Sequence, residues 1–518
     1  MSDAVGSAER NPMAGAVWAL RRGFWNGLTT VKFRGNRPAV VSAPPDRERP
    51  VVPIPFRAVY PDIPINGLVV ADHVPADEVT PMKRVFTAVQ TALYKVFPPM
   101  QGGLPAISPD ANEALSSAYP PAHRRDFRLP RRPAEYAEGP DLGRLAVASP
   151  YACYLQRTGE GQLRWDLAAL DGFECQPGLR PPAAVVDFRI DESGRRLEAV
   201  SIDCDLGRSS PGDRDWQAAT GLALCAVTTH LSLVRHFNWI HLVAGAQLAM
   251  ATRNHLSSDH PLRRLLWPHV YGTQSSNQVV TGPQMSPGGD FEAVFSYTHR
   301  GMCDLFEAMC GDFDLGMIEP DVDAGRRGVL AAGFDTPALD NRRQLMDVLL
   351  AHTRRYLDAY YPDEDSLAAD GEFGDWLAAM DRDLPHGVGA ITAGAVSVDG
   401  AARLLATLIY LVTVEHEIVG SGLWDYQLWS DVHPVRVYRD GSRPPLDVYL
   451  RLVNGDFILN VHRMLLMTDF SELAVDLRGA EAFRAFLRDL RGLQAELDRQ
   501  PAACWRMEPK MLKANINA

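Results

Sequence analysis

Long segments with apolar residues at helical spacing recur along the chain from residue 216 onward, and they constrain its fold more than any other feature. The segments cover residues 216–256, 298–311, 342–361, 400–420 and 480–498. Loops that contain glycine and proline separate them. Amphipathic helices of this length are stable when their apolar faces pack around a common core. The sequence therefore predicts a mainly α protein built around long central helices.

A short stretch ahead of these helices has a different pattern. Residues 183–205 are rich in β-branched and alternating apolar side chains, and the turn-forming run Asp191-Glu192-Ser193-Gly194 interrupts them. Such a pattern is typical of a hairpin. We therefore expect a small antiparallel β element near residues 183–205.

The composition limits the number of domains and the kinds of partner. The chain has 518 residues, of which 46% are hydrophobic, so it can bury one large core or two to three average domains. Residues 1–50 are basic and rich in proline, which predicts an extended or loosely held arm ahead of the body. The net charge of −12 speaks against nucleic acid as a main partner, because phosphate binding needs a basic face.

The cysteines and the first residues of the chain bear on its compartment. The seven cysteines are scattered and contain no CxxC pair, so neither a disulfide framework nor a cysteine-based zinc site is predicted. Arg21, Arg22 and Asn26 interrupt the apolar stretch that a signal peptide would need. The longest uncharged apolar run, residues 404–414, is shorter than the roughly 20 residues that cross a bilayer. We expect a reducing, cytoplasmic location.

Aromatic and basic side chains alternate in residues 14–34. Trp18, Phe24 and Trp25 lie among several arginines and lysines, so this segment could rest on a membrane surface as an interfacial helix. A helix docked on the protein's own surface, or a disordered leader, accounts for the same pattern and is the favoured interpretation. A weak membrane-surface contact through residues 14–34 is the alternative.

Histidines are concentrated in one part of the chain. Six of the fourteen fall within forty residues, and a seventh, His416, lies in a later apolar run. The six are His230, His236, His241, His255, His260 and His269. Neutral imidazole is the commonest protein ligand for transition metals, so the cluster predicts a metal site.

The spacing of these histidines leaves two interpretations open. His236 and His241 lie five residues apart, which places them about 140° from each other on a regular α-helix. A π-bulge would restore a common face, and without one the pair is better interpreted as two separately hydrogen-bonded side chains. Buried His416 needs a partner, and a metal or a hydrogen bond to a carbonyl, Glu415 or Glu417 would satisfy it equally well.

Several segments, in order, resemble the lipoxygenase family. The run HFNWIH at residues 236–241, followed by NHLSSDHPLRRLLWPH ending at His269, is similar to the family's H-x4-H pair and its HL...HP-x-x-x-LL-x-PH run. GPDLGRLAVASP at residues 139–150 and HEIVGSGLWDY at residues 416–426 resemble two further family segments. The final residues, 514–518, read ANINA and are similar to the family's N-S-[IV]-x-I ending. The resemblance covers most of the chain.

The resemblance implies a fold and a metal site. The fold would be a lipoxygenase-like helical catalytic domain over residues 51–518, without the amino-terminal β-barrel of eukaryotic members. The implied iron ligands, which are also the implied catalytic groups, are His236, His241, His416 and the α-carboxylate of Ala518. Manganese would also suit this ligand set. Gly420 stands where the family has a weakly bound Asn, His or Ser, and it has no side chain to offer.

The resemblance also implies an activity. The protein would be a non-haem iron dioxygenase that removes hydrogen from a doubly allylic C–H of a polyunsaturated fatty acid or similar apolar substrate and adds O2 to give a hydroperoxide. The alternative is a lipoxygenase-fold protein that acts on another small molecule or on hydroperoxides, or that binds lipid or metal without catalysis. The oligomeric state is left open by the sequence.

Some residues depart from the family pattern or fall outside its ligand set. The run 276–281 replaces the family's IN-x-LAR, which predicts a rebuilt wall of the substrate channel. A family glutamine ahead of the first ligand is replaced by Leu231 or Ser232. The remaining histidines of the cluster are interpreted as structural groups or as supports for the ligands.

Overall fold

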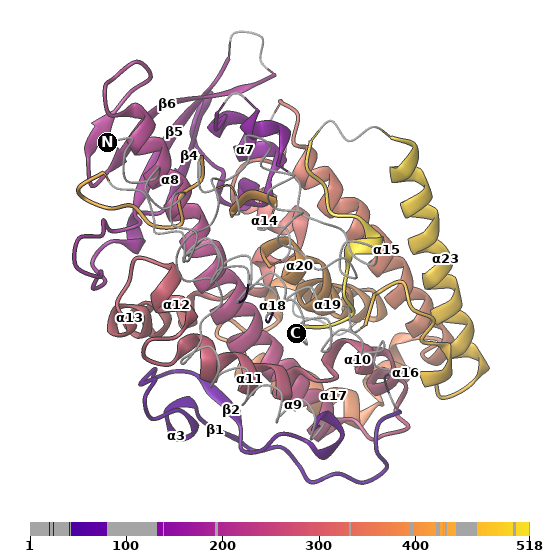
Figure 1. Cartoon of the computed structure of the whole chain (residues 1–518). Helices are drawn as coiled ribbons and strands as arrows, with labels where there is room; N and C mark the ends of the chain where they lie inside the picture. The colour runs from indigo at the N-terminus through magenta and orange to yellow at the C-terminus, as the bar shows by residue number, and fades with distance from the viewer. Residues whose placement is uncertain are drawn as a thin grey trace.

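One long helical rod, from Trp216 to His255, runs through the middle of the molecule (Figure 1). It consists of α8 (Trp216–Thr229), the π-helix η5 (His230–Gly245) and α9 (Ala246–His255). By length and composition it is the one helix among the described residues that could cross a membrane, and 78% of its most apolar window is buried inside the fold. Its apolar side chains belong to the main hydrophobic core.

The structure is a computed structural model. It describes residues 20, 24, 41, 43–79, 132–137, 139–191, 195–330, 333–392, 397–420, 425–427, 429, 432–441, 464–500 and 504–516. The membrane contact predicted for residues 14–34 therefore lies outside the described residues, except at Leu20 and Phe24. Of the arm predicted for residues 1–50, the structure describes residues 43–50 and three earlier positions.

A five-stranded antiparallel sheet lies beside α8 at one end of the molecule (Figure 1). In spatial order its strands are β3 (Gln156–Gly159), β4 (Gln162–Asp166), β5 (Ala184–Ile190), β6 (Leu197–Cys204) and β7 (Gly207–Ser209). The β5–β6 pair confirms the predicted β element near residues 183–205, whose turn residues 192–194 lie outside the described residues. The other three strands have at most five residues each and lack a long apolar alternation, so the sequence pattern does not reveal them.

Three long helices pack side by side on the other flank of the rod. They are α15 (Pro337–Tyr360), α19 (Val398–Tyr410) and α23 (Leu477–Arg499), and α15 contacts both of the others. The side chains of Ser397 and Asp476 accept backbone hydrogen bonds and cap α19 and α23. α19 continues without a break into a second π-helix, η8 (Leu411–Glu415), and then into α20 (His416–Val419). The predicted mainly α fold with long central helices is confirmed.

Shorter helices complete the body. They are α7 (Leu142–Ala148), α10 (Pro261–Val270), α11 (Thr273–Met285), α12 (Asp290–Val294), α13 (His299–Met309), α14 (Pro320–Arg326), α16 (Glu364–Ala368), α17 (Gly371–Asp383) and α18 (Gly389–Thr392). α11 follows a left-handed turn at Gly272 (φ 81°) and contacts both η5 and α9. This contact places the first turn of α11 beside the middle of the rod.

Residues 43–79 form a segment that we call the strap. It contains β1 (Pro53–Pro55), α3 (Phe56–Val59), β2 (Val69–Ala71) and the 3₁₀ turn η1 (Ala76–Glu78). β1 and β2 pair as an antiparallel ribbon, and β2 lies against α9 and η5. The strap thus crosses the outside of the helices on which the histidine cluster lies (Figure 1).

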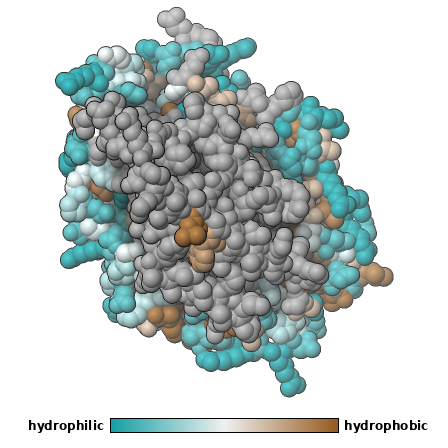
Figure 2. All heavy atoms as spheres, viewed as in Figure 1, coloured by the Kyte–Doolittle hydropathy of each residue, from teal (hydrophilic) through white to brown (hydrophobic). Residues whose placement is uncertain are grey.

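On the face shown in Figure 2, the described surface residues are mostly hydrophilic, and apolar ones form small, separate groups. Large exposed apolar side chains among the described residues are scattered along the chain, at Leu20, Phe24, Val52, Leu330, Val475 and Leu477. Isolated exposed apolar residues are ordinary on a protein surface and indicate no particular partner.

Candidate metal centre

The three histidines that the sequence selects come together in the core. His236 and His241 lie on the π-helix η5, and His416 is the first residue of α20, directly after the π-helix η8. A π-helix bonds residue i to residue i+5, so side chains five apart share a face. The structure therefore supplies the common face that a regular helix would deny His236 and His241, through a 16-residue π-helix and not a single bulged turn.

The geometry of the three imidazoles fits a single metal ion. Their ring centres lie 4.8 to 5.1 Å apart, and one nitrogen from each lies within 4.8 Å of the others. The Nε2 atoms of His241 and His416 are 3.1 Å apart. Two nitrogens that bind one metal at a right angle, each about 2.1 Å from it, are separated by about 3 Å. The spacing is that of two adjacent ligands.

The protonation state of the cluster also suits a metal. All three residues are at most 4% exposed, and burial lowers the pKa of each imidazole, that of His241 to about 3. The rings are therefore neutral at pH 7, which is the form that coordinates metal. The Nε2 atom of His236 is buried and has no hydrogen-bond partner among the described residues. Burial of a polar atom without a partner costs free energy, and a metal ion would supply the partner.

Two buried side chains fix the orientation of the rings. Asn277 of α11 makes two polar contacts with His241. Its Oδ1 lies 3.0 Å from the ring Nδ1, and its Nδ2 donates to the His241 carbonyl at 2.8 Å. Glu417 Oε1 lies 3.1 Å from Nδ1 of His416. Each contact takes up Nδ1 and leaves Nε2 as the metal-facing lone pair. His416 thus has the Glu417 partner that one interpretation predicts, and its other ring nitrogen faces the cluster, where the second interpretation would place a metal.

The carboxy-terminal segment runs into the same region. Ile516 is fully buried, and its Cδ1 lies so close to Gly245 of η5 that a Cβ at Gly245 would be only 2.8 Å from it. His269 Nδ1 lies 2.8 Å from the Ala514 carbonyl, and Asn515 Nδ2 donates to the Pro268 carbonyl at 2.8 Å. Ala518, whose carboxylate the resemblance implies as a ligand, lies outside the described residues.

Gly420 lies at the edge of the histidine cluster. A Cβ at this position would be 2.8 Å from the His416 carbonyl oxygen and 3.2 Å from His236 Nε2. The Gly420 backbone therefore occupies the space beside His236, and a side chain could enter only if one of these groups moved. Gly420 lacks a side chain, and the structure has no room for one at this position.

The other histidines of the sequence cluster are not part of this group of three, and three of them have partners of their own. His230 Nδ1 lies 2.9 Å from the Tyr154 hydroxyl, and His260 caps α10 while its Nε2 lies 2.9 Å from Asp370. His269 holds the carboxy-terminal segment, as described above, and His255 is the half-buried last residue of α9.

Three charged residues lie directly behind the candidate ligands, and sequence reasoning named one of them, Glu415, only as a possible partner of His416. Arg235 precedes His236, Glu415 precedes His416, and the Glu415 carboxylate accepts from Arg235 Nη2 at 3.2 Å and from Arg342 Nη1 of α15. Glu415 is fully buried. The triad ties the two ligand-bearing helices together one residue before each ligand. Its only sequence signal is a charged residue inside an apolar helical run.

The run 276–281, predicted to form a rebuilt channel wall, has another role at its start. Ser276 Oγ donates to the Ile516 carbonyl at 3.2 Å, and Asn277 holds His241. Both side chains are at most 4% exposed. These two residues support the histidine cluster and the carboxy-terminal segment.

Comparisons with known proteins assign this architecture. No protein-family model matches the chain. In an alignment 291 residues long that covers 50% of this chain, the sequence is 26% identical to chloroplastic lipoxygenase 1 of Tanacetum cinerariifolium. The structure superposes on that of manganese lipoxygenase of Gaeumannomyces graminis with a TM-score of 0.70, covering 99% of this chain and 100% of that one at 13% identity. The chain has a divergent lipoxygenase-family catalytic domain.

The matches cover different shares of the relatives' own length. The chain spans about a third of the length of the first curated lipoxygenases that it matches, 31% and 32% respectively. A LOX protein solved anaerobically in complex with arachidonate has a TM-score of 0.71 over 90% of this chain and 79% of that one, at 15% identity. The lipoxygenase-like motifs around His236, His269 and His416 therefore identify the family correctly.

Proposed function

We propose that this lipoxygenase-family protein is a non-haem dioxygenase that oxygenates a polyunsaturated fatty acid or a similar apolar molecule to a hydroperoxide. Its metal would be iron, with manganese as the alternative, held by Nε2 of His236, His241 and His416 and by the carboxylate of Ala518. The observation that carries the proposal is the buried, unpartnered Nε2 of His236 among two further neutral imidazoles. A set of three neutral nitrogens and one carboxylate is typical of such metals.

The bound metal would supply the one-electron step that removes a hydrogen atom from a weak C–H bond before O2 adds to the carbon radical. The protein's own residues do the rest. Asn277 and Glu417 hold Nδ1 of two ligands, so that their Nε2 atoms cannot turn away from the centre. Phe237 stacks on His241 with ring centres 5.5 Å apart and packs against Phe291, so one wall of the site is apolar and water-excluding.

The fourth ligand is proposed from the course of the carboxy-terminal segment. Residues 512–516 are buried beside η5 and α11. Ser276 donates to the Ile516 carbonyl and the Asn515 side chain donates to the Pro268 carbonyl of α10, and these bonds hold the segment in the core. A carboxylate two residues further on needs no special side chain in order to bind a metal. Ala518 is therefore compatible with this role, although the family usually has isoleucine there.

Two measurements test the proposal. The purified protein is expected to contain close to one equivalent of iron or manganese by mass spectrometry. It is also expected to consume O2 and form conjugated-diene absorbance with linoleate or arachidonate. A protein with stoichiometric metal and no O2 uptake on any fatty acid would exclude the fatty-acid substrate and leave a more compact apolar one. A protein that retains neither metal would refute the metal centre.

A further inference from the structure

The first turn of α11 joins three separate parts of the molecule, the central rod, the strap and the carboxy-terminal segment. Each of four consecutive residues forms a hydrogen bond to a residue outside α11, two of them to the rod. The bonds are Gln274 Nε2 to the Ala246 carbonyl (3.2 Å), Ser275 N to Glu78 Oε2 (2.9 Å), Ser276 Oγ to the Ile516 carbonyl (3.2 Å) and Asn277 Nδ2 to the His241 carbonyl (2.8 Å). The turn thus links the start of α9, the strap, the carboxy-terminal segment and a ligand histidine.

The start of α11 has no capping side chain of its own. Its N-cap residue is Gly272, in a left-handed conformation, and the first amide groups of any helix lack partners within that helix. The Glu78 carboxylate of the strap takes this role from 197 residues away by accepting from Ser275 N. A carboxylate at a helix amino terminus is also favoured by the helix dipole. Glu78 thus replaces the missing cap.

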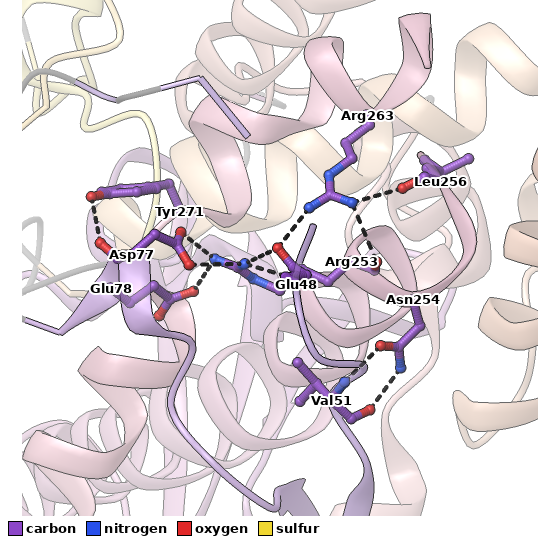
Figure 3. A network of polar contacts seen from close by, with 9 residues as sticks. All are labelled: Glu48, Val51, Asp77, Glu78, Arg253, Asn254, Leu256, Arg263 and Tyr271. Carbon is purple, nitrogen blue, oxygen red and sulfur yellow. Dashed lines mark hydrogen bonds and ion pairs between the residues drawn. The ribbon is translucent and has the colours of Figure 1, made fainter. Parts of the chain in front are cut away.

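Glu78 is held in a fixed position by its other oxygen (Figure 3). Arg253 of α9 donates to Glu78 Oε1 at 2.7 Å and also binds Glu48 and Asp77 of the strap. The Arg253 side chain is fully buried and its guanidinium lies 4.6 Å from the Trp267 ring centre. The Glu78 side chain is fully buried as well. Because both carboxylate oxygens are engaged, Glu78 cannot rotate without breaking a charged hydrogen bond.

Only half a helical turn separates the capped amide from the ligand's support. Ser275 bonds to Glu78, and Asn277, two residues later, holds both the ring and the carbonyl of His241. A shift of the first turn of α11 would therefore move Asn277 and release Nδ1 of His241. The strap is thus connected to His241 by Glu78, the first turn of α11 and Asn277.

We propose that Glu78 is a positioning residue for the metal centre: by capping α11 at Ser275 it sets Asn277, and through Asn277 the orientation of the His241 ring. This inference rests on the proposed function, because it assumes that His241 is a metal ligand. It extends the centre to the strap, which supplies no ligand. Loss of Glu78 is expected to weaken metal retention without any change in the ligands.

A matched pair of variants tests the inference. Glu78→Ala and Glu48→Ala each remove one carboxylate from Arg253, but only Glu78 contacts α11. The rate of metal loss to a chelator is measured by mass spectrometry, and amide hydrogen exchange is measured in residues 273–285. Glu78→Ala is expected to lose metal about 10 to 100 times faster than the wild type, the usual cost of removing an outer support of a ligand. It should also speed exchange at the start of α11.

Glu48→Ala is expected to leave metal loss and exchange in α11 within about twofold of the wild type, since the cap is intact. Equal effects of the two variants on metal loss, or wild-type metal loss in Glu78→Ala, would overturn the inference. If Glu78→Ala does not fold, Glu78→Gln, which keeps an acceptor oxygen, is compared with Glu48→Gln and is expected to lose metal at an intermediate rate.

The two proposals fail in different ways. A wild-type protein that binds neither iron nor manganese refutes the proposed function. The exchange measurement on the metal-free protein then still decides whether Glu78 fixes α11. A wild-type protein that binds metal, with unchanged metal loss and exchange in Glu78→Ala, refutes only the positioning role.

Discussion

Replacing Glu415 by glutamine is expected to destabilise the fold and the metal centre together. The Glu415 side chain is fully buried and accepts hydrogen bonds from Arg235 and Arg342. Burial alone would raise the pKa of Glu415, but the Arg342 and Arg235 charges outweigh it and hold the pKa below its usual value. The carboxylate is therefore ionised at neutral pH. Glutamine would leave two guanidinium groups without a buried counter-charge.

The size of the effect follows from these contacts. Removal of one partner from a buried ion pair costs about 3 to 5 kcal/mol, because an uncompensated charge remains. The entropy of unfolding is about 2.1 cal per mole per kelvin per residue, or about 1.1 kcal per mole per kelvin for 518 residues. A loss of about 4 kcal/mol therefore lowers Tm by about 4 °C. The metal content should fall as well, because Glu415 and Arg235 each adjoin a ligand.

Calorimetry of the metal-free protein measures the Tm, and mass spectrometry of the protein as purified measures the metal content. Asp321→Asn is the control, because Asp321 is half exposed and its ion pair with Arg343 is a surface pair worth less than about 1 kcal/mol. A triple variant, Arg235→Met with Glu415→Leu and Arg342→Met, removes all three charges at once. It should be more stable than Glu415→Gln.

An unchanged Tm in Glu415→Gln would refute this reasoning. It would mean that the two guanidinium groups find other partners or water when the carboxylate is lost. A triple variant less stable than the single one would show instead that packing, and not charge, is the main contribution of these side chains.

The remaining predictions concern the centre itself. His241→Ala or His416→Ala is expected to retain less than about a tenth of the wild-type metal, measured by mass spectrometry; full retention would remove that residue from the ligand set. A short extension after Ala518 is expected to lower metal content in the same way, while an amino-terminal tag should not; an extended protein with full metal would exclude the terminal carboxylate. Gly420→Ala should weaken metal retention because its Cβ would press on His236 and the His416 carbonyl, whereas Gly282→Ala in α11, where nothing lies within 4 Å, serves as its control.

Sequence reasoning reached the family and the histidines because their signals are local. The H-x4-H pair and the run ending at His269 are contiguous, and the apolar periodicity that predicts α15, α19 and α23 needs no knowledge of distant residues. The spacing of His236 and His241 made a π-helical turn the condition for a shared metal, and the structure has a π-helix of sixteen residues there. The extent of that π-helix was beyond prediction, since it depends on the packing of η5 against its neighbours.

Glu417, the neighbour of His416, could be named from the sequence as a partner of that ring, whereas the other supports of the centre depend on long-range contacts. Asn277 was assigned to a channel wall because nothing in its neighbourhood shows that the helix after Gly272 folds back onto His241. Glu78 meets Ser275 across 197 residues. The partners of Glu415 likewise come from two other helices. Of these residues, only Glu415 stands out in the sequence, as a charged residue in an apolar run.

The contact between the strap and α11 joins segments that the ribosome makes at different times. Glu48 and Arg253 are 205 residues apart, and a ribosome that adds about 5 to 20 residues per second needs about 10 to 40 s to cover that distance. During this interval the acidic strap has emerged without its arginine. The Arg253 contacts with the strap and the Glu78 cap on α11 can both be in place only after Ser275 has left the ribosomal tunnel. The surroundings of His241 can therefore form only after more than half of the chain has been made, and the strap spends roughly two fifths of translation without the helices that it contacts.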